Sequence, residues 1–166
     1  MDKEIYYLSD QLGLALKSSA MILASAESCT GGWISQAVTM VPGSSGWFDR
    51  GFVTYTNQSK QEILGVRSAT LDREGAVSEL AVREMAQGAL HNSRANCSVA
   101  VSGIAGPDGG TASKPVGTVW LAIALKNGDN RAWCLHLQGD RDTVRRETVL
   151  AALRALIDLL RQPQSA

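Results

Sequence analysis

A serine-bearing loop followed by a lysine is the first candidate for chemistry in this chain. The loop at residues 43–46 contains Ser45, and Tyr55 and Lys60 follow it in the sequence. Lys60 is expected in the first turn of a helix, where the helix dipole opposes an ammonium and burial would favour the neutral amine. A neutral lysine is a competent base for a serine hydroxyl, which favours Ser-Lys nucleophilic catalysis. The alternative is an ordinary solvated lysine, and the sequence alone does not bring Ser45 to Lys60.

Two glycine-rich loops, at residues 26–32 and 102–110, each follow a short apolar run that is typical of a strand. Glycine lets the backbone approach a ligand, and ligands of open α/β sheets bind outside the carboxyl ends of the strands. The first loop also precedes a helix start, which offers N–H donors to an anion. These loops predict a pocket for a polar, anionic small molecule, although the first loop matches no known nucleotide motif. The alternative is that Ser28 or Thr30 merely caps the following helix.

Three further side chains bear on chemistry. Arg141 and Arg145 stand four residues apart on one predicted helix face, where their like charges repel unless an anion such as phosphate bridges them. A solvated helix face, with Glu147 compensating the charge, is the alternative. Cys29 has no histidine near it in the sequence, so we interpret it as a small buried apolar residue rather than a thiol nucleophile.

The elements that must position these residues follow from hydrophobic periodicity and breaker residues. Helices are expected at about residues 2–19, 31–41, 57–64, 78–92 and from 140 to Pro163. Strands are expected at residues 21–26, 52–55, 97–102, 117–125 and 131–137. Asn57 is the predicted cap of its helix, Gly65 its end, and Asn127-Gly128 a hairpin turn. The alternation predicts an α/β fold: one three-layer α/β/α domain over residues 1–166, with a mixed, mostly parallel sheet and one hairpin.

Composition excludes several classes of function. The 166 residues carry a formal net charge of zero, so no global field attracts nucleic acid or an anionic membrane. Three widely spaced cysteines and two distant histidines predict neither a disulfide framework nor a metal site, and no cofactor is expected. The sequence shows no signal peptide and no apolar stretch of about 20 residues, so we expect a cytoplasmic protein.

Several motifs in order resemble one family, that of the C-terminal domain of the competence/damage-inducible protein CinA. They are residues 26–32, 43–48 and 50–55, Asn57 with Lys60, and residues 75–79, 102–110 and 114–120. The resemblance covers essentially the whole chain. Larger members of the family carry an additional N-terminal domain, which we do not expect here.

The resemblance implies hydrolysis of the carboxamide of nicotinamide mononucleotide (NMN), giving nicotinate mononucleotide and ammonia. It also implies an α/β/α fold, a homodimer or higher homo-oligomer, and no metal. By this resemblance Ser45, Lys60 and Tyr55 are the catalytic residues. The resemblance also implies that Ser28, Ser102 and Arg141 contact the substrate. The glycine-rich loops themselves add Thr30, Gly31, Gly103 and Gly106 to the expected contacts, and helix geometry adds Arg145.

Two alternatives remain open at this point. One is a module of the same fold that binds NMN or a related nucleotide without catalysis. The other is an amidase that acts on a different phosphorylated carboxamide, with the same serine and lysine but another pocket for the heterocycle.

Overall fold

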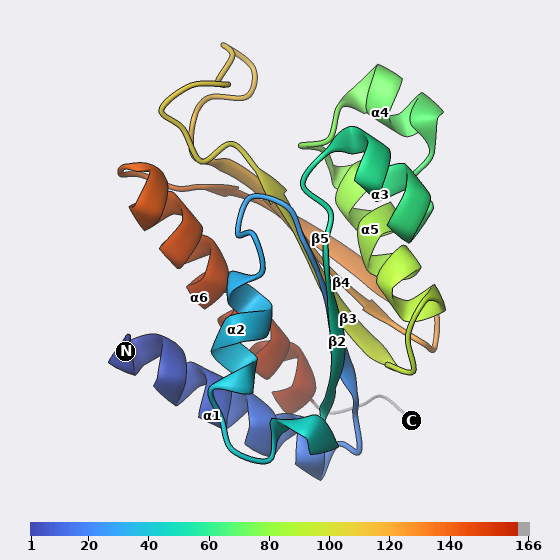
Figure 1. The fold of residues 1–166 in the computed structure, drawn as a ribbon, viewed down its shortest axis with the longest axis vertical. Helices are drawn as coiled ribbons and strands as arrows, with labels where there is room; N and C mark the ends of the chain where they lie inside the picture. Colours follow the sequence, from blue (N-terminus) through green and yellow to red (C-terminus); the bar gives the residue numbers. More distant parts are fainter. Residues whose placement is uncertain (163–166) are drawn as a thin grey trace.

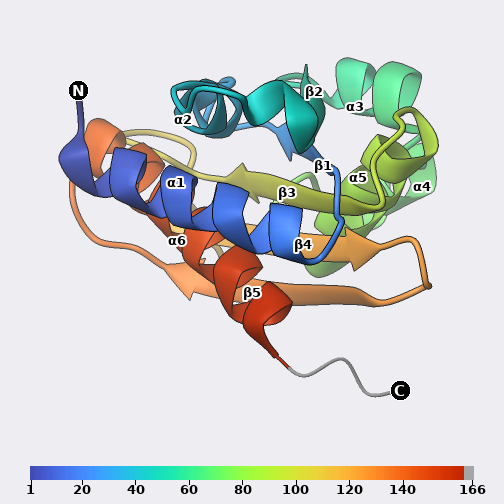
Figure 2. The same ribbon diagram turned by 90° about the horizontal axis from the view of Figure 1, so that it is seen from below.

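A computed structural model describes residues 1–162, which form one five-stranded sheet with helices on both faces. The strands are β1 Leu23–Glu27, β2 Phe48–Val53, β3 Cys97–Gly103, β4 Thr118–Leu125 and β5 Asn130–His136. Their order across the sheet is β2-β1-β3-β4-β5, which can be followed from top to bottom in Figure 2. The pairs of β1 with β2 and with β3 are parallel, whereas β3–β4 and β4–β5 are antiparallel. The mixed sheet and its hairpin are confirmed, although only half of the strand pairs are parallel.

The helices form two layers, as the sequence predicted (Figure 1). One face of the sheet carries α1 Lys3–Ser18, α2 Trp33–Thr39 and α6 Arg141–Arg161, and the other carries α3 Asn57–Leu64, α4 Ser68–Glu74 and α5 Glu79–His91. Each layer closes its own apolar cluster against the sheet. Strands β1 and β3 are buried almost along their whole length because both of their faces are covered.

Side-chain caps set most helix starts. Asp2, Ser78 and Asp140 accept hydrogen bonds from the first backbone N–H groups of α1, α5 and α6. The predicted cap Asn57 is wrong by one residue: Thr56 caps α3 and forms a reciprocal capping box with Ser59. The helix α4 was not predicted.

The predicted end of the last helix at Pro163 lies outside the described residues. Across residues 1–162, no helix has the length and apolar character needed to cross a membrane.

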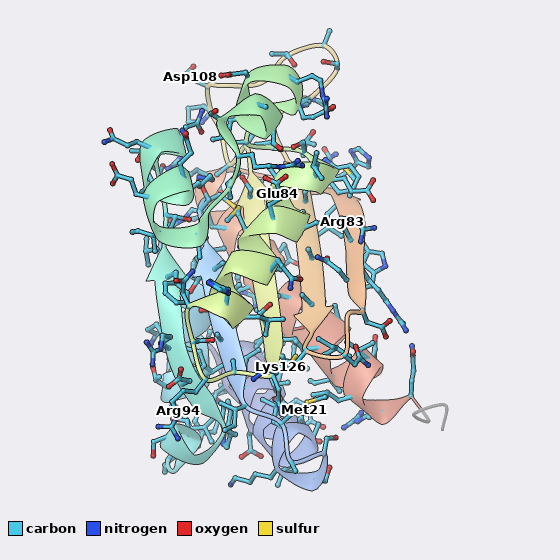
Figure 3. The ribbon with its side chains drawn as sticks, turned by 90° about the vertical axis from the view of Figure 1, so that its right-hand side faces the viewer. Met21, Arg83, Glu84, Arg94, Asp108 and Lys126 are labelled. Atoms are coloured by element: carbon cyan, nitrogen blue, oxygen red, sulfur yellow. The ribbon has the colours of Figure 1, made fainter. Side chains whose placement is uncertain are left out.

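The sheet has two chemically different ends, which Figure 3 separates. Asp108, in the loop after β3, lies at one end, whereas Met21, just before β1, lies at the other with Arg94 and Lys126. Parallel strands β1, β2 and β3 run in the same direction, so the loops that follow them meet at the first of these ends. This carboxyl edge is where open α/β sheets bind their ligands.

The contact between α5 and the end of α3 depends on one glycine. A Cβ added at Gly88 would lie 2.0 Å from the carbonyl oxygen of Leu64. Alanine favours a helix over glycine by about 1 kcal/mol, but overpacking against a backbone atom costs about 1–3 kcal/mol. We therefore expect Gly88→Ala to lower the free energy of unfolding by about 1–2 kcal/mol in urea denaturation. Gly46→Ala is the matched control, since no atom lies within 4 Å of an added Cβ there; equal midpoints for the two variants would contradict this packing.

Candidate active site

A cavity of about 200 Å³ opens at the carboxyl edge of the sheet. The loops after β1 and β3, the segment between β2 and α3, the turn between α4 and α5, and the start of α6 form its walls. Its lining residues are Ser28, Cys29, Tyr55, Asn57, Lys60, Ala76, Val77, Ser102, Gly103, Ala105 and Arg141. Two larger hollows, of about 390 and 550 Å³, lie between the β4–β5 hairpin and α6 and between α3 and α5. Of the three, the smallest places serine hydroxyls beside a buried amine, so it is the candidate active site.

Lys60 and Ser28 are in direct contact inside this cavity. The Lys60 Nζ lies 2.9 Å from the Ser28 Oγ, 2.6 Å from the Thr54 carbonyl oxygen and 3.5 Å from the Tyr55 carbonyl oxygen. Lys60 is only 1% exposed, and its burial lowers the pKa of the amine from 10.5 to about 8. The buried lysine with a lowered pKa that the sequence favoured is therefore present.

The surroundings of this amine suit it to act as a base. A neutral amine has two N–H donors and one lone pair. The two carbonyl oxygens of Thr54 and Tyr55 accept the two donors, which leaves the lone pair for the hydroxyl hydrogen of Ser28. Lys60 can then take the proton of Ser28, which makes the serine oxygen a nucleophile.

The backbone that holds the amine is continuous with the sheet. Thr54 follows β2, and its N–H donates to the carbonyl oxygen of Glu27 at 2.9 Å, so the β1–β2 pairing extends one residue beyond the strand. The Thr56 cap then starts α3, which carries Lys60 back over the end of β1. The Ser28 N–H donates to the Val101 carbonyl oxygen of β3 at 3.1 Å. Ser28 and the segment that leads to Lys60 are thus both held by strands β1, β2 and β3.

Within this chain the structure does not bring Ser45 to Lys60, whose hydroxyl contact is Ser28. Ser45 lies exposed in the short 3₁₀ turn Ser44–Gly46, just before β2. This turn sits at the amino end of the sheet, because the carbonyl oxygen of nearby Trp47 accepts from the N–H of Leu23, the first residue of β1. Ser28 follows the last residue of β1, so the length of this strand, about 16 Å, separates the two ends.

Tyr55 and Arg141 form the rim of the cavity. The Arg141 guanidinium donates to the Tyr55 hydroxyl at 3.0 Å and to the Gly106 carbonyl oxygen at 2.8 Å. Tyr55 therefore approaches Lys60 through its backbone carbonyl, while its hydroxyl faces Arg141. Both side chains are exposed, so the guanidinium of Arg141 is accessible to a ligand that enters the cavity.

The other expected substrate contacts divide into two groups. Ser102 and Gly103, at the end of β3, line the cavity together with Ser28. Thr30 does not: it is fully buried, and its hydroxyl donates to Glu27. The predicted Arg141–Arg145 anion clamp does not form in this structure, because Arg145 donates to the carbonyl oxygens of Cys29 and Thr30 and stacks 5.4 Å from the Trp33 ring centroid.

Two glycines and one cysteine complete the predicted set. Gly31 lies outside the cavity lining and adopts a φ of 61°, which allows the tight turn between β1 and α2. Gly106 contributes the carbonyl oxygen that holds Arg141. Burial raises the pKa of the Cys29 thiol to about 11, which agrees with the interpretation of this residue as a small buried side chain.

Sequence reasoning missed two residues of the site. Asn57 lines the cavity instead of capping its helix. Glu27 is completely buried beneath the Ser28 loop. A carboxylate directly after an apolar run was the available signal for Glu27, since a buried charge needs a specific set of partners.

Comparison with known proteins gives a consistent result. The family model of the CinA C-terminal domain matches residues 6–160. The chain is 52% identical over 155 residues to proteins of Shigella flexneri and Escherichia coli K12, each described as nicotinamide-nucleotide amidohydrolase PncC; 93% of this chain and 94% of each relative are covered. It is also similar to the crystal structure of the competence/damage inducible protein CihA from Agrobacterium tumefaciens, with a TM-score of 0.93, 45% identity and 98% of both chains covered. The chain belongs to the CinA C-terminal domain family.

Proposed function

We propose that this protein is an NMN amidohydrolase that uses Ser28 as nucleophile and Lys60 as base. The observation that carries the proposal is the 2.9 Å contact between the Ser28 Oγ and the buried Lys60 Nζ inside the cavity. The relatives described as nicotinamide-nucleotide amidohydrolases, about half identical over nearly the whole chain, supply the substrate class.

The proposed reaction has two halves. Neutral Lys60 takes the hydroxyl proton of Ser28 while the serine oxygen attacks the carboxamide carbon of NMN. The lysine then returns this proton to the nitrogen, the C–N bond breaks, and ammonia leaves an acyl-serine. In the second half, Lys60 deprotonates a water that attacks the ester. The C–O bond to Ser28 breaks, the serine regains a proton, and nicotinate mononucleotide leaves as the carboxylate.

The loop after β1 offers donors for the oxyanion. Among residues 1–162, the backbone N–H groups of Cys29 and Thr30 have no backbone acceptor, whereas the N–H of Ser28 is held by Val101. Free N–H groups next to a nucleophile stabilise the tetrahedral intermediate, and losing one such donor costs about 3–4 kcal/mol in other enzymes. Of these two residues only Cys29 lines the cavity, so we assign the oxyanion site to the N–H group of Cys29.

The rim supplies the remaining contacts. Arg141 presents a guanidinium that suits the 5′-phosphate of NMN, and Ser102 and Gly103, which also line the cavity, are assigned to the ribose. Binding of the phosphate at a distance from the reacting carbon helps to orient the carboxamide. In this arrangement Tyr55 lies between the phosphate site and Lys60.

The direct test is ammonia release from NMN by the purified protein. We expect equal amounts of ammonia and nicotinate mononucleotide, measured by a coupled enzymatic assay and by chromatography. NMN-dependent thermal stabilisation without ammonia release would support a binding module instead. Faster release from another phosphorylated carboxamide would change the substrate while keeping the two catalytic residues.

Nicotinamide riboside, which lacks the phosphate, is the matched control substrate. We expect its kcat/KM to be about 100-fold lower than that of NMN, because a guanidinium–phosphate contact is worth about 2–3 kcal/mol. Arg141→Ala should remove most of this preference by weakening turnover of NMN alone. An unchanged preference in Arg141→Ala would place the phosphate elsewhere.

A further inference from the structure

Glu27 is a buried acid for which the proposed reaction has no step. It is the last residue of β1 and has no exposed surface. Its Oε1 accepts from the Thr30 hydroxyl and from the Ile34 N–H, both at 2.7 Å. Its Oε2 accepts from the N–H and the hydroxyl of Ser35, at 2.9 and 2.8 Å. Four short hydrogen bonds from neighbouring donors compensate the loss of hydration, so the carboxylate is stable where it lies.

These bonds tie both sides of the loop that carries Ser28. The loop at residues 28–32 joins β1 to α2, and the donors lie either in the loop or in the first turn of the helix. The residue at the N-cap position of α2, Gly32, has no side chain with which to cap it. Glu27 takes over this capping from the far side of the loop, where the helix dipole also favours a negative charge.

The backbone of Glu27 also contacts Thr54, the residue whose carbonyl oxygen holds the Lys60 amine. The Glu27 carbonyl oxygen accepts from the Thr54 N–H at 2.9 Å, and the Thr54 carbonyl oxygen accepts from the Lys60 Nζ at 2.6 Å. Glu27 is therefore bonded, through its side chain, to the loop of the nucleophile and, through its backbone, to the residue that holds the base. A shift of its side chain would move Ser28 relative to Lys60.

The space around the carboxylate is filled on the side of β2. The Ser35 hydroxyl, which donates to Glu27, also lies 2.8 Å from the Ser25 hydroxyl. A Cβ added at Gly51 would lie 2.0 Å from the Ser35 Oγ and 2.8 Å from the Ser25 Oγ. The edge strand β2 can therefore approach these serine hydroxyls only with glycine at position 51. A larger residue at this position would disturb the hydrogen bonds of Glu27 without changing Glu27 itself.

We propose that Glu27 is a positioning residue: its carboxylate fixes the Ser28 loop on α2 so that the serine hydroxyl stays aligned with Lys60 and with the carboxamide carbon. This inference rests on the proposed function for the identity of the nucleophile. It differs from a purely structural role, in which the carboxylate would stabilise the fold and leave the geometry of the Ser28–Lys60 pair unchanged.

The test uses Glu27→Gln, which keeps the shape but turns an N–H₂ group toward the N–H of Ser35. We expect kcat to fall about 100-fold, since a misplacement of about 1 Å has this effect, while KM for NMN stays within about twofold. Ser35→Ala removes only one hydroxyl donor and should lower kcat less, and Gly51→Ala should act in the same direction. Gln36→Ala, at an exposed residue of α2 whose side chain makes no hydrogen bond within residues 1–162, is the control and should match the wild type.

All rates are measured well below the melting temperature of each variant, where circular dichroism reports a folded protein. A second readout is the rate at which a fluorophosphonate labels Ser28, which requires no turnover of NMN. Slower labelling of Glu27→Gln supports the proposal even if the wild type releases no ammonia, in which case only the proposed substrate fails. A lower melting temperature with wild-type kcat and labelling rate would overturn it, as would a change in KM alone.

Discussion

Replacing Ser28 with alanine is expected to reduce ammonia release from NMN by at least about 10³-fold, the scale of loss when a nucleophile that acts with its base is removed. The side chain is small and the cavity is open, so the fold should persist. NMN should still bind, because the groups assigned to its phosphate and ribose are untouched. Steady-state kinetics and NMN-dependent thermal stabilisation, measured on the same preparation, separate the two effects.

Ser45→Ala is the matched control, since it makes the same change in an exposed turn at the opposite end of β1. We expect its kcat and KM to equal those of the wild type. Mass spectrometry of protein quenched during turnover should detect the acyl group on the peptide that contains Ser28. An inactive Ser45→Ala variant, or an acyl group on its peptide, would exclude the assignment of Ser28.

The contrast between these two serines shows which part of the site was accessible from the sequence. Both stand in small-residue loops, but Ser28 follows a strand and Ser45 precedes one. Parallel strands bring together the residues that follow them, so Ser28 and Ser102 could be expected at one edge of the sheet. The lysine and its lowered pKa were predicted from the helix start. The predicted pairing of Lys60 with Ser45 does not follow from this rule, because Ser45 precedes a strand, whereas Ser28 follows one.

The parts of the fold with strong local signals were predicted. The buried strands β1 and β3, the β4–β5 hairpin and the capped helices α1, α5 and α6 carry apolar periodicity together with caps or turn residues. The helix α4 was missed because its seven residues are mostly polar and no side chain caps its start. Its position depends on tertiary contacts, such as that of Thr70 with Glu84 of α5 at 2.8 Å.

The partners of long charged side chains were beyond prediction for a related reason. Arg145 has the same spacing to Arg141 whether it binds phosphate or protein, and only the folded chain brings the carbonyl oxygens of Cys29 and Thr30 to its guanidinium. Glu27 likewise finds its donors up to eight residues away, across a turn whose shape is set by two glycines with positive φ, Gly31 and Gly32. Sequence spacing fixes which groups can meet, whereas the backbone path decides which of them do.

The rate of the reaction is expected to depend strongly on pH, because it requires Lys60 in its neutral form. Burial disfavours the ammonium form and lowers the pKa of Lys60 from 10.5 to about 8, and only the neutral amine can accept the proton of Ser28. We therefore expect kcat/KM to fall tenfold for each pH unit below about 8 and to level off above it. At pH 7.5 about a quarter of the enzyme would hold the neutral amine, against about one part in a thousand at the ordinary pKa of 10.5.

Lys60→Met tests whether the amine causes this dependence. Methionine fills a similar buried volume without a charge, so we expect a folded protein whose kcat is lower by at least about 10³-fold and whose residual rate no longer rises toward pH 8. Lys126→Met, in the exposed hairpin turn at the far end of the sheet, is the matched control and should keep the wild-type profile (Figure 3). A wild-type profile that is flat between pH 6 and pH 9 would contradict general-base catalysis by Lys60, because a base with a pKa of about 8 must lose its proton within this interval.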